Sequence, residues 1–301
     1  MVDAKDPRPA SRLRLSEAEA RLLAERAGVT WPADFLRELT ATPGSNGDEK
    51  PPAEHGAARE GEVAASADSP LASLLDRGVL QHDGAKVVVH PSVQMNLELL
   101  FNSLAYVLVR GQRGEYAVRA LYAVNEPLGA SLFLLEDWGL ELSLFDARGL
   151  VQELSRCVPP GAPQGDEGSR PDRSSPLTGR VPLAALMGSA LASEMGRALP
   201  GTMTAAETDL MSRIAGEADG HLTFLVNGPG RDRTLHVAPQ LWISSAAGWS
   251  AVRRVVPTDA ERAGGYGVVV DLEPVEPHDV VDGIAYDLAG VIQANSQGVA
   301  S

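Results

Sequence analysis

The sequence predicts an α+β fold made of two related halves with pseudo-twofold symmetry, each an antiparallel sheet with flanking helices. Residues 104–158 and 220–292 contain the same order of strands, glycine turns and a closing helix. The turns are short, which favours antiparallel pairing, because parallel strands need long crossovers. The two closing helices also share one apolar pattern. Its matching positions are Leu150 with Val280, Val151 with Val281, Leu154 with Ile284 and Val158 with Leu288.

The first repeat predicts strands at residues 105–110, 116–124, 131–135 and 140–144, followed by a helix that begins near Leu150. The second predicts strands at residues 222–226, 235–243, 251–256 and 268–272, followed by a helix near Val280. Glycine turns at residues 111–114 and 227–230 separate the first two strands of each repeat. Residues 116–124 alternate in the way that is typical of a strand with one well-buried face.

The N-terminal segment, residues 1–40, is predicted to be helical. Ser16 and Glu19 form a capping box, and Gly28 is a suitable C-cap. Residues 31–39 continue with apolar side chains at helical spacing. Residues 41–70 are predicted to be a disordered loop, because they contain many prolines, glycines and acids and almost nothing large and apolar.

The first α+β half is expected to span residues 71–158. It begins with a helical face of leucines that stops at Gly78, followed by a hairpin around a His82-Asp83-Gly84 turn and a helix that Pro91 opens. Residues 159–180 are predicted to be a flexible linker. The second half spans residues 181–292 and begins with helices at 183–199 and 205–215, and residues 293–301 form a disordered tail.

Composition limits the classes of function. The chain has 301 residues, 44% hydrophobic residues and a formal net charge of −14, which supports a real core and disfavours nucleic-acid binding. Cys157 is the single cysteine, so no intrachain disulfide forms, which fits a reducing cytoplasm. The sequence contains neither a secretory signal nor a stretch of about 18 apolar residues, so we expect a cytoplasmic protein with no membrane span.

The chemistry-bearing residues favour structural roles, so we expect no enzyme, cofactor or metal site. Cys157 lies on an apolar helix face and is predicted to be a buried structural cysteine. The glycine-rich turns lead into strands and not into helices, so they lack the geometry of a phosphate cradle. Asp279 is a suitable N-cap for the last helix. We do not expect the histidines to bind a metal, and the ones considered as ligands are His82, His90, His221 and His236.

The tryptophans are the candidate protein-binding residues. Trp138, Trp242 and Trp249 lie at strand ends or beside glycine, and tryptophan is enriched at protein interfaces. The alternative is that these side chains fill the core. Sheet edges offer a further route, because they can accept a partner strand.

The chain resembles the EspG family of type VII (ESX) secretion-associated proteins of actinobacteria. The resemblance covers most of the chain and is carried by pattern and order. It lies in residues 13–32 at the start, residues 74–80 before the hairpin, and the unit from Gly248-Trp249 through residues 268–272 to the final helix. It implies two related halves and a cytosolic chaperone or adaptor. Such a protein binds the helical tips of PE/PPE-like or WXG100-like secretion substrates and keeps them soluble.

Two other functions stay open at this point. The first is a hydrolase-like enzyme whose site has no known motif and joins His82, His90 or His236 to carboxylates. The second is a regulatory module whose symmetry drives homodimerisation. The resemblance has no motif specific enough to assign individual binding residues, and the predicted 41–70 loop and 159–180 linker depart from the family pattern.

Overall fold

The computed structural model describes residues 11–29, 69–103, 105–135, 139–159, 175–187, 203–229 and 235–298. Several sequence-based predictions fall wholly or mostly outside these ranges: the helical segment at 31–39, the 41–70 loop, most of the 159–180 linker, the second part of the helix at 183–199, and Trp138. They stay predictions.

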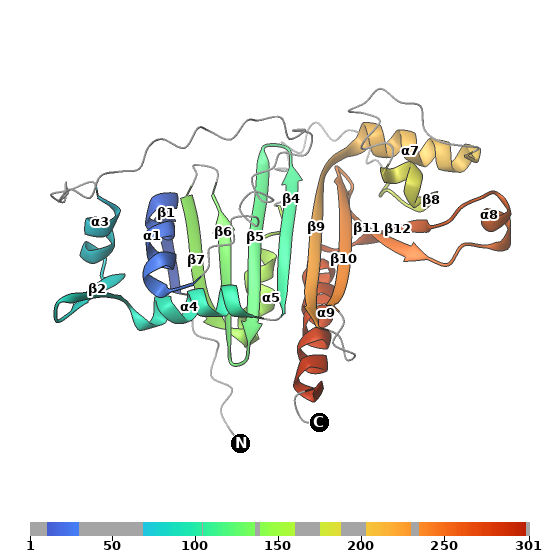
Figure 1. Ribbon diagram of the computed structural model, residues 1–301. Coiled ribbons are helices and arrows are strands. Elements are labelled where there is room, and N and C mark those ends of the chain that lie inside the picture. The colour runs from blue at the N-terminus through green and yellow to red at the C-terminus, as the bar shows by residue number, and fades with distance from the viewer. Residues whose placement is uncertain are drawn as a thin grey trace, which may run out of the picture.

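Ten strands form one antiparallel sheet in the order β1-β7-β6-β5-β4-β9-β10-β11-β12-β8 (Figure 1). The predicted α+β class is therefore confirmed. The expected two sheets are joined into one, because β4 pairs with β9 along its whole length. The strands are β1 Ser11–Ser16, β4 Tyr106–Arg113, β5 Tyr116–Asn125, β6 Leu128–Leu134, β7 Gly139–Asp146, β8 Gly179–Pro182, β9 Ala218–Pro229, β10 Leu235–Ser245, β11 Gly248–Val255 and β12 Val269–Val275.

The order of strands is the same from either edge of the sheet. Each edge strand, β1 or β8, is followed inward by the last, third, second and first strand of its repeat. The registers agree as well. In the first half, Asn125 pairs with Leu128 across the two-residue turn between β5 and β6. In the second half, Ser245 pairs with Gly248 across the matching turn between β10 and β11. At the centre of the sheet, β4 and β9 pair symmetrically about Val109, which lies opposite Phe224.

Helices cover both faces of the sheet. The short α5 (Leu150–Ser155) and the long α9 (Pro277–Gly298) lie behind it in Figure 1, over a shared apolar core. The front carries α1 (Glu17–Ala27), α3 (Pro70–Asp76) and α4 (Pro91–Asn102) over the first half, and α7 (Ala205–Glu217) over the second. A second small sheet joins β2 (Leu80–Asp83) to β3 (Lys86–Val89).

The predicted signals at the ends of helix α1 are confirmed. Ser16 and Glu19 form the predicted capping box of α1, and the structure shows a capping box of the same kind at Thr204 and Glu207 of α7. Gly28 ends α1 with a φ of 68°, a left-handed conformation that favours glycine. These positions depend on local backbone chemistry, which the sequence displays directly.

The structure corrects several boundaries. Strand β1 and the short helix α8 (Asp259–Ala263) were not predicted. Both glycine turns are shifted: residues 111–113 belong to β4 and residues 227–229 to β9, because the ladder between these strands continues past the glycines. His82 and Asp83 lie in β2, with the turn just after them. Gly179 begins β8 and is not part of a linker, and α9 continues through Gly298 into the predicted tail.

The central strand β5 is buried on both faces and not on one. Val118, Ala120 and Tyr122 contact the core under α5 and α9, whereas Leu121 and Ala123 belong to the core under α1 and α4. The second face is apolar enough to be covered, and helices from outside the repeat cover it. Within the described residues, no helix is both long enough and apolar enough to cross a membrane.

Candidate functional site

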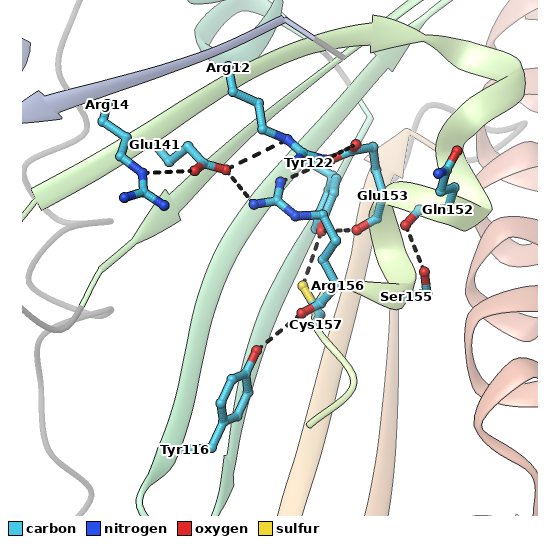
Figure 2. Close-up of polar contacts among 10 residues, drawn as sticks. All are labelled: Arg12, Arg14, Tyr116, Tyr122, Glu141, Gln152, Glu153, Ser155, Arg156 and Cys157. Atoms are coloured by element: carbon cyan, nitrogen blue, oxygen red, sulfur yellow. Dashed lines mark hydrogen bonds and ion pairs between the residues drawn. The ribbon is translucent and has the colours of Figure 1, made fainter. Parts of the chain in front are cut away.

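A partly buried cluster of charged side chains joins β1, β7 and α5, and Figure 2 shows how its members meet. The register places Arg14 of β1 opposite Glu141 of β7. Because side chains alternate along a strand, both face α5. From that helix and its C-terminal end, Glu153 and Arg156 reach toward the same point. Strand pairing therefore brings β1, which is distant in sequence, to β7 and α5, which follow each other along the chain.

Each carboxylate of the cluster meets more than one arginine. Glu153 accepts from Arg12 Nη2 at 3.0 Å and from Arg156 Nη1 at 3.0 Å. Glu141 accepts from Arg14 Nε at 3.4 Å and also from Arg156. Both glutamates are only 4% exposed. The guanidinium of Arg156 also lies 4.2 Å from the ring centroid of Phe133, a cation–π contact.

These contacts decide the ionisation of the buried groups. Burial by itself would raise the pKa of Glu141, but the hydrogen bond and charge of Arg156, with Arg14 and Arg12, outweigh it and hold the pKa below its usual value. For Arg156, burial would lower the pKa, and the bonds to Glu141 and Glu153 raise it overall. Glu141 and Arg156 therefore form an ionised pair at neutral pH, and each carboxylate of the cluster contacts an arginine.

Tyr122 and Cys157 continue the network into the core. The hydroxyl of Tyr122 donates to the backbone oxygen of Glu153 at 2.7 Å and lies 3.1 Å from Cys157 Sγ. Burial raises the pKa of the Cys157 thiol to about 12. Since the thiolate is the nucleophile, this cysteine is unreactive at neutral pH. The prediction of a buried structural cysteine is confirmed.

The second half has only part of this arrangement. Arg180 of β8 lies opposite Asp271 of β12 with an Nε–Oδ1 distance of 2.9 Å, the same edge-strand pairing as Arg14 and Glu141. The α9 positions that match Glu153 and Arg156 are Gly283 and Tyr286. In the second half Arg180 pairs instead with Glu261 of α8, so among the described residues an ion network that ties the closing helix to the sheet is found for α5 and not for α9.

The histidines considered in the sequence do not come together. His82 and His90 both belong to the β2–β3 hairpin, where alternation along the ladder places them on opposite faces. His90 caps α4, and its Nδ1 contacts the Ser92 hydroxyl. His221 lies on β9, where burial lowers its pKa. His236 lies on β10 of the other sheet, far from the hairpin in Figure 1, and its side chain is outside the described part.

Asp279, an acid that the sequence singled out, has a structural role at the start of α9. Asp279 lies in the first turn of α9 and not at its N-cap, and accepts from the backbone nitrogen of Glu276 at 3.1 Å. Asp279 therefore bonds the backbone just before the helix from a position within the first turn. Among the residues that the structure describes, no three His, Cys, Asp or Glu side chains gather into a group that could hold a metal ion.

The structure corrects the prediction that Trp242 and Trp249 bind a partner protein, because both side chains are buried. Trp242 and Trp249 are each 4% exposed and lie in the core under α9, so neither forms a docking surface. Trp242 meets Phe224 edge to face at a centroid distance of 5.3 Å. The register explains this position, because both tryptophans share a strand face with apolar residues that α9 covers. The alternative interpretation, that these tryptophans fill the core, is confirmed.

At the centre of the sheet, the front face carries apolar side chains that are more exposed than those on the back face under α5 and α9. It is the face of β4, β5, β9 and β10 that lies opposite to α5 and α9, which are behind the sheet in Figure 1. Leu225 and Leu241 are half-buried, Pro239 is exposed, and Val237 is 42% exposed. Arg110 of β4 and Arg119 of β5 lie beside them, directly opposite each other. We call this region, Arg110, Arg119, Leu225, Val237, Pro239 and Leu241, the central face.

Sequence reasoning missed both regions. Arg12 and Arg14 meet the glutamates only when β1 joins the edge of the sheet, and β1 was not predicted. Comparisons with known proteins add no assignment: no protein-family model matches the chain, and no curated protein matches it.

Proposed function

We propose that this chain is a non-enzymatic, cytosolic adaptor or chaperone of the EspG type. It would bind a helical type VII secretion substrate, PE/PPE-like or WXG100-like, and keep it soluble for export. The observation that carries the proposal is the central face, in which the apolar side chains of Leu225, Val237, Pro239 and Leu241 are partly exposed on the sheet. An apolar tip on a helical hairpin is prone to aggregate, and a surface of this kind can cover it.

The duplicated architecture supports the proposal. We infer that the two halves are related by pseudo-twofold symmetry, with the axis through the pair Val109 and Phe224. The common strand order and the matching turns after Asn125 and Ser245 support this inference. Two related halves are also what the resemblance to the EspG family implies. Under this arrangement the central face lies at the junction of the halves, where both contribute strands.

The chemistry of the ion cluster supports a structural role and not a catalytic one. Its carboxylates are paired with arginines, and its thiol has a pKa of about 12. A general base or a nucleophile needs a group that is poised to change its protonation state near neutral pH. The cluster instead fixes α5 to the sheet and leaves the opposite face for binding.

The direct test is reconstitution with a defined partner. Helical-hairpin secretion substrates encoded in the host genome are produced with the chain, and the purified pair is measured by calorimetry and light scattering. We expect a stable complex and a substrate that no longer aggregates. If none of these substrates forms a complex, and affinity purification from the host also recovers no secretion component, the proposal is wrong.

A matched pair of variants locates the binding face. Val237 of β10 is 42% exposed on the central face, and Val151 of α5 is 40% exposed on the opposite face. A charge introduced into an apolar contact is left desolvated, so Val237→Glu should weaken the complex at least about tenfold. Val151→Glu should leave the affinity unchanged. The same loss in both variants would contradict this choice of face.

A further inference from the structure

We propose that a buried water molecule bridges the hydroxyls of Ser131 and Ser143 to the carboxylate of Glu153, and so adds to the anchor of α5. This inference concerns the first half of the fold and does not depend on the proposed function. The two serines are directly opposite on β6 and β7, and both are fully buried. Among the described residues, neither hydroxyl has a hydrogen-bond partner.

The serines lie in the middle of a row of side chains that crosses four strands. Tyr122 of β5 is opposite Ser131, and Arg12 of β1 is opposite Ser143. Side chains at directly opposite positions share one face of a sheet. Since Tyr122 belongs to the core under α5 and α9, the whole row faces those helices.

The two ends of the row reach the same residue of α5. Arg12 Nη2 donates to Glu153 Oε1 at 3.0 Å, and the Tyr122 hydroxyl donates to the Glu153 backbone oxygen at 2.7 Å (Figure 2). Glu153 therefore spans the row above the two serines, whose short side chains do not bond it directly. A carboxylate accepts about four hydrogen bonds, so Glu153 keeps acceptor capacity beside its contacts with Arg12 and Arg156.

Aromatic rings close the row on either side along the strands. The ring of Phe145 occupies the space above Gly129, and the ring of Phe133 meets that of Tyr122 edge to face at a centroid distance of 5.7 Å. Bulk water is thus kept from the two hydroxyls. A single water needs a space of only about 10–15 Å³ and makes about three hydrogen bonds to buried polar groups. The two serines and Glu153 supply three such partners.

The second half shows that the repeated fold does not require serine in this row. The position that matches Ser131 is Ala251, which lies between Trp242 of β10 and Glu273 of β12. A buried hydroxyl without a partner costs free energy, and native proteins pair almost all of them. Two such hydroxyls side by side in the first half therefore point to a ligand that both of them bind.

The first test is the sign of a stability change. Ser131→Ala removes one partner of the water and should lower the midpoint of thermal unfolding by about 2–4 °C. If the hydroxyl had no partner at all, alanine would remove the cost of its burial and the midpoint would rise. An unchanged or higher midpoint would overturn the inference.

A matched control introduces a hydroxyl without a partner into the same core. Ala120 of β5 is fully buried, with Val109 and Phe133 opposite it on the neighbouring strands. Ala120→Ser should lower the midpoint, because its hydroxyl is buried among apolar side chains. Shifts of opposite sign in Ala120→Ser and Ser131→Ala would show that the Ser131 hydroxyl is unpaired, and would contradict the water site.

The double variant tests whether the two serines share one ligand. Ser143→Ala should lower the midpoint as Ser131→Ala does. Because both hydroxyls bind the same water, the double variant should lose less than the sum of the two single shifts. Additive shifts would mean that the hydroxyls act independently, and would overturn the inference.

The water can also be observed directly. A high-resolution crystal structure of the unaltered chain should show an ordered water within about 3 Å of both serine hydroxyls. Ordered serines with no water between them would overturn the inference. In solution, relaxation dispersion of the water oxygen counts long-lived internal waters, and the double variant should have one fewer than the unaltered chain. Equal counts would also overturn it.

Discussion

The helices α5 and α9 close the two halves in the same place and are held there by different means. The short α5 has six residues, and its contacts to the sheet include the ion network of Glu141, Glu153 and Arg156. The long α9 has 22 residues and lies on the core with an apolar stripe. The buried members of that stripe are Val280, Val281, Ile284, Leu288 and Val291.

This difference shows how length decides the kind of anchor. A stripe along several turns removes enough apolar area from water to fix a helix, since burial is worth about 25 cal/mol per Å². A helix of fewer than two turns buries little, so its orientation depends on contacts with a defined direction. The matching of Val151 with Val281 illustrates the point, because the first is 40% exposed and the second is buried.

The largest expected effect comes from the apolar anchor. Ile284 of α9 is fully buried at the position that matches Leu154 of α5. Ile284→Ala leaves a cavity under the middle of the helix and should lower the free energy of unfolding by about 4 kcal/mol. Urea denaturation followed by circular dichroism measures this loss.

The control for this prediction lies on the same helix. Tyr286 is 81% exposed, so Tyr286→Ala should change the free energy of unfolding by no more than about 0.5 kcal/mol. If Ile284→Ala behaves like Tyr286→Ala, then apolar burial does not hold α9, and the contrast with α5 fails.

The two anchors also differ in how far the sequence reveals them. The stripe of α9 repeats at helical spacing, so it was predicted from periodicity, and the capping box at Ser16 was predicted from a local motif. These features depend on neighbours in the chain. The sequence could therefore predict the α+β class and most strands of both repeats.

The ion cluster depends instead on contacts between distant segments. Arg14 meets Glu141 only because β1 pairs with β7, and no local pattern announces that pairing. The prediction that the tryptophans form a docking surface was wrong for a related reason. Trp242 and Trp249 lie near glycine and strand ends, yet α9 covers the sheet face on which they lie. Burial is decided by what packs on a strand, which spacing along the strand does not specify.

The second prediction breaks the polar anchor. Glu141→Gln keeps the shape of the side chain but removes the charge that Arg156, Arg14 and Arg12 surround. The half-buried Arg156 would then lose a charge-assisted hydrogen bond, and the free energy of unfolding at neutral pH should fall by up to about 3 kcal/mol. The control is Glu17→Gln, which removes an exposed pair with Arg21 and should cost no more than about 0.5 kcal/mol.

The dependence on pH distinguishes charge from shape in this variant. The pKa of Glu141 in the folded chain is lowered from an ordinary value of 4.5, so its charge stabilises the fold above that value. The contribution is lost as the pH falls through the lower, folded pKa. The difference between the unaltered chain and Glu141→Gln should therefore shrink in acid. A difference that stays constant from neutral to acid pH would assign the loss to packing.

The same core shows a second contrast between the halves, in the sizes of paired side chains. In the first half, Gly129 of β6 lies opposite Phe145 of β7, and a methyl group on Gly129 would overlap the phenyl ring. In the second half, the matching pair is Trp249 and Val275. The large side chain thus comes from the fourth strand, β7, in the first half and from the third strand, β11, in the second. Each half therefore divides the volume of this part of the core differently between its two strands.

The third prediction tests this division and has the smallest effect. Gly129→Ala should lower the free energy of unfolding by about 2 kcal/mol, because the buried ring of Phe145 cannot move aside without disturbing the core. In a chain that already carries Phe145→Val, the valine found at the matching position of β12 leaves room for the methyl group, and the same change should cost less than about 0.5 kcal/mol. Four urea titrations, one for each protein of the double-mutant cycle, measure the coupling. Equal costs in both backgrounds would mean that the ring does not limit the glycine position, and that the two halves divide their core volume without this constraint.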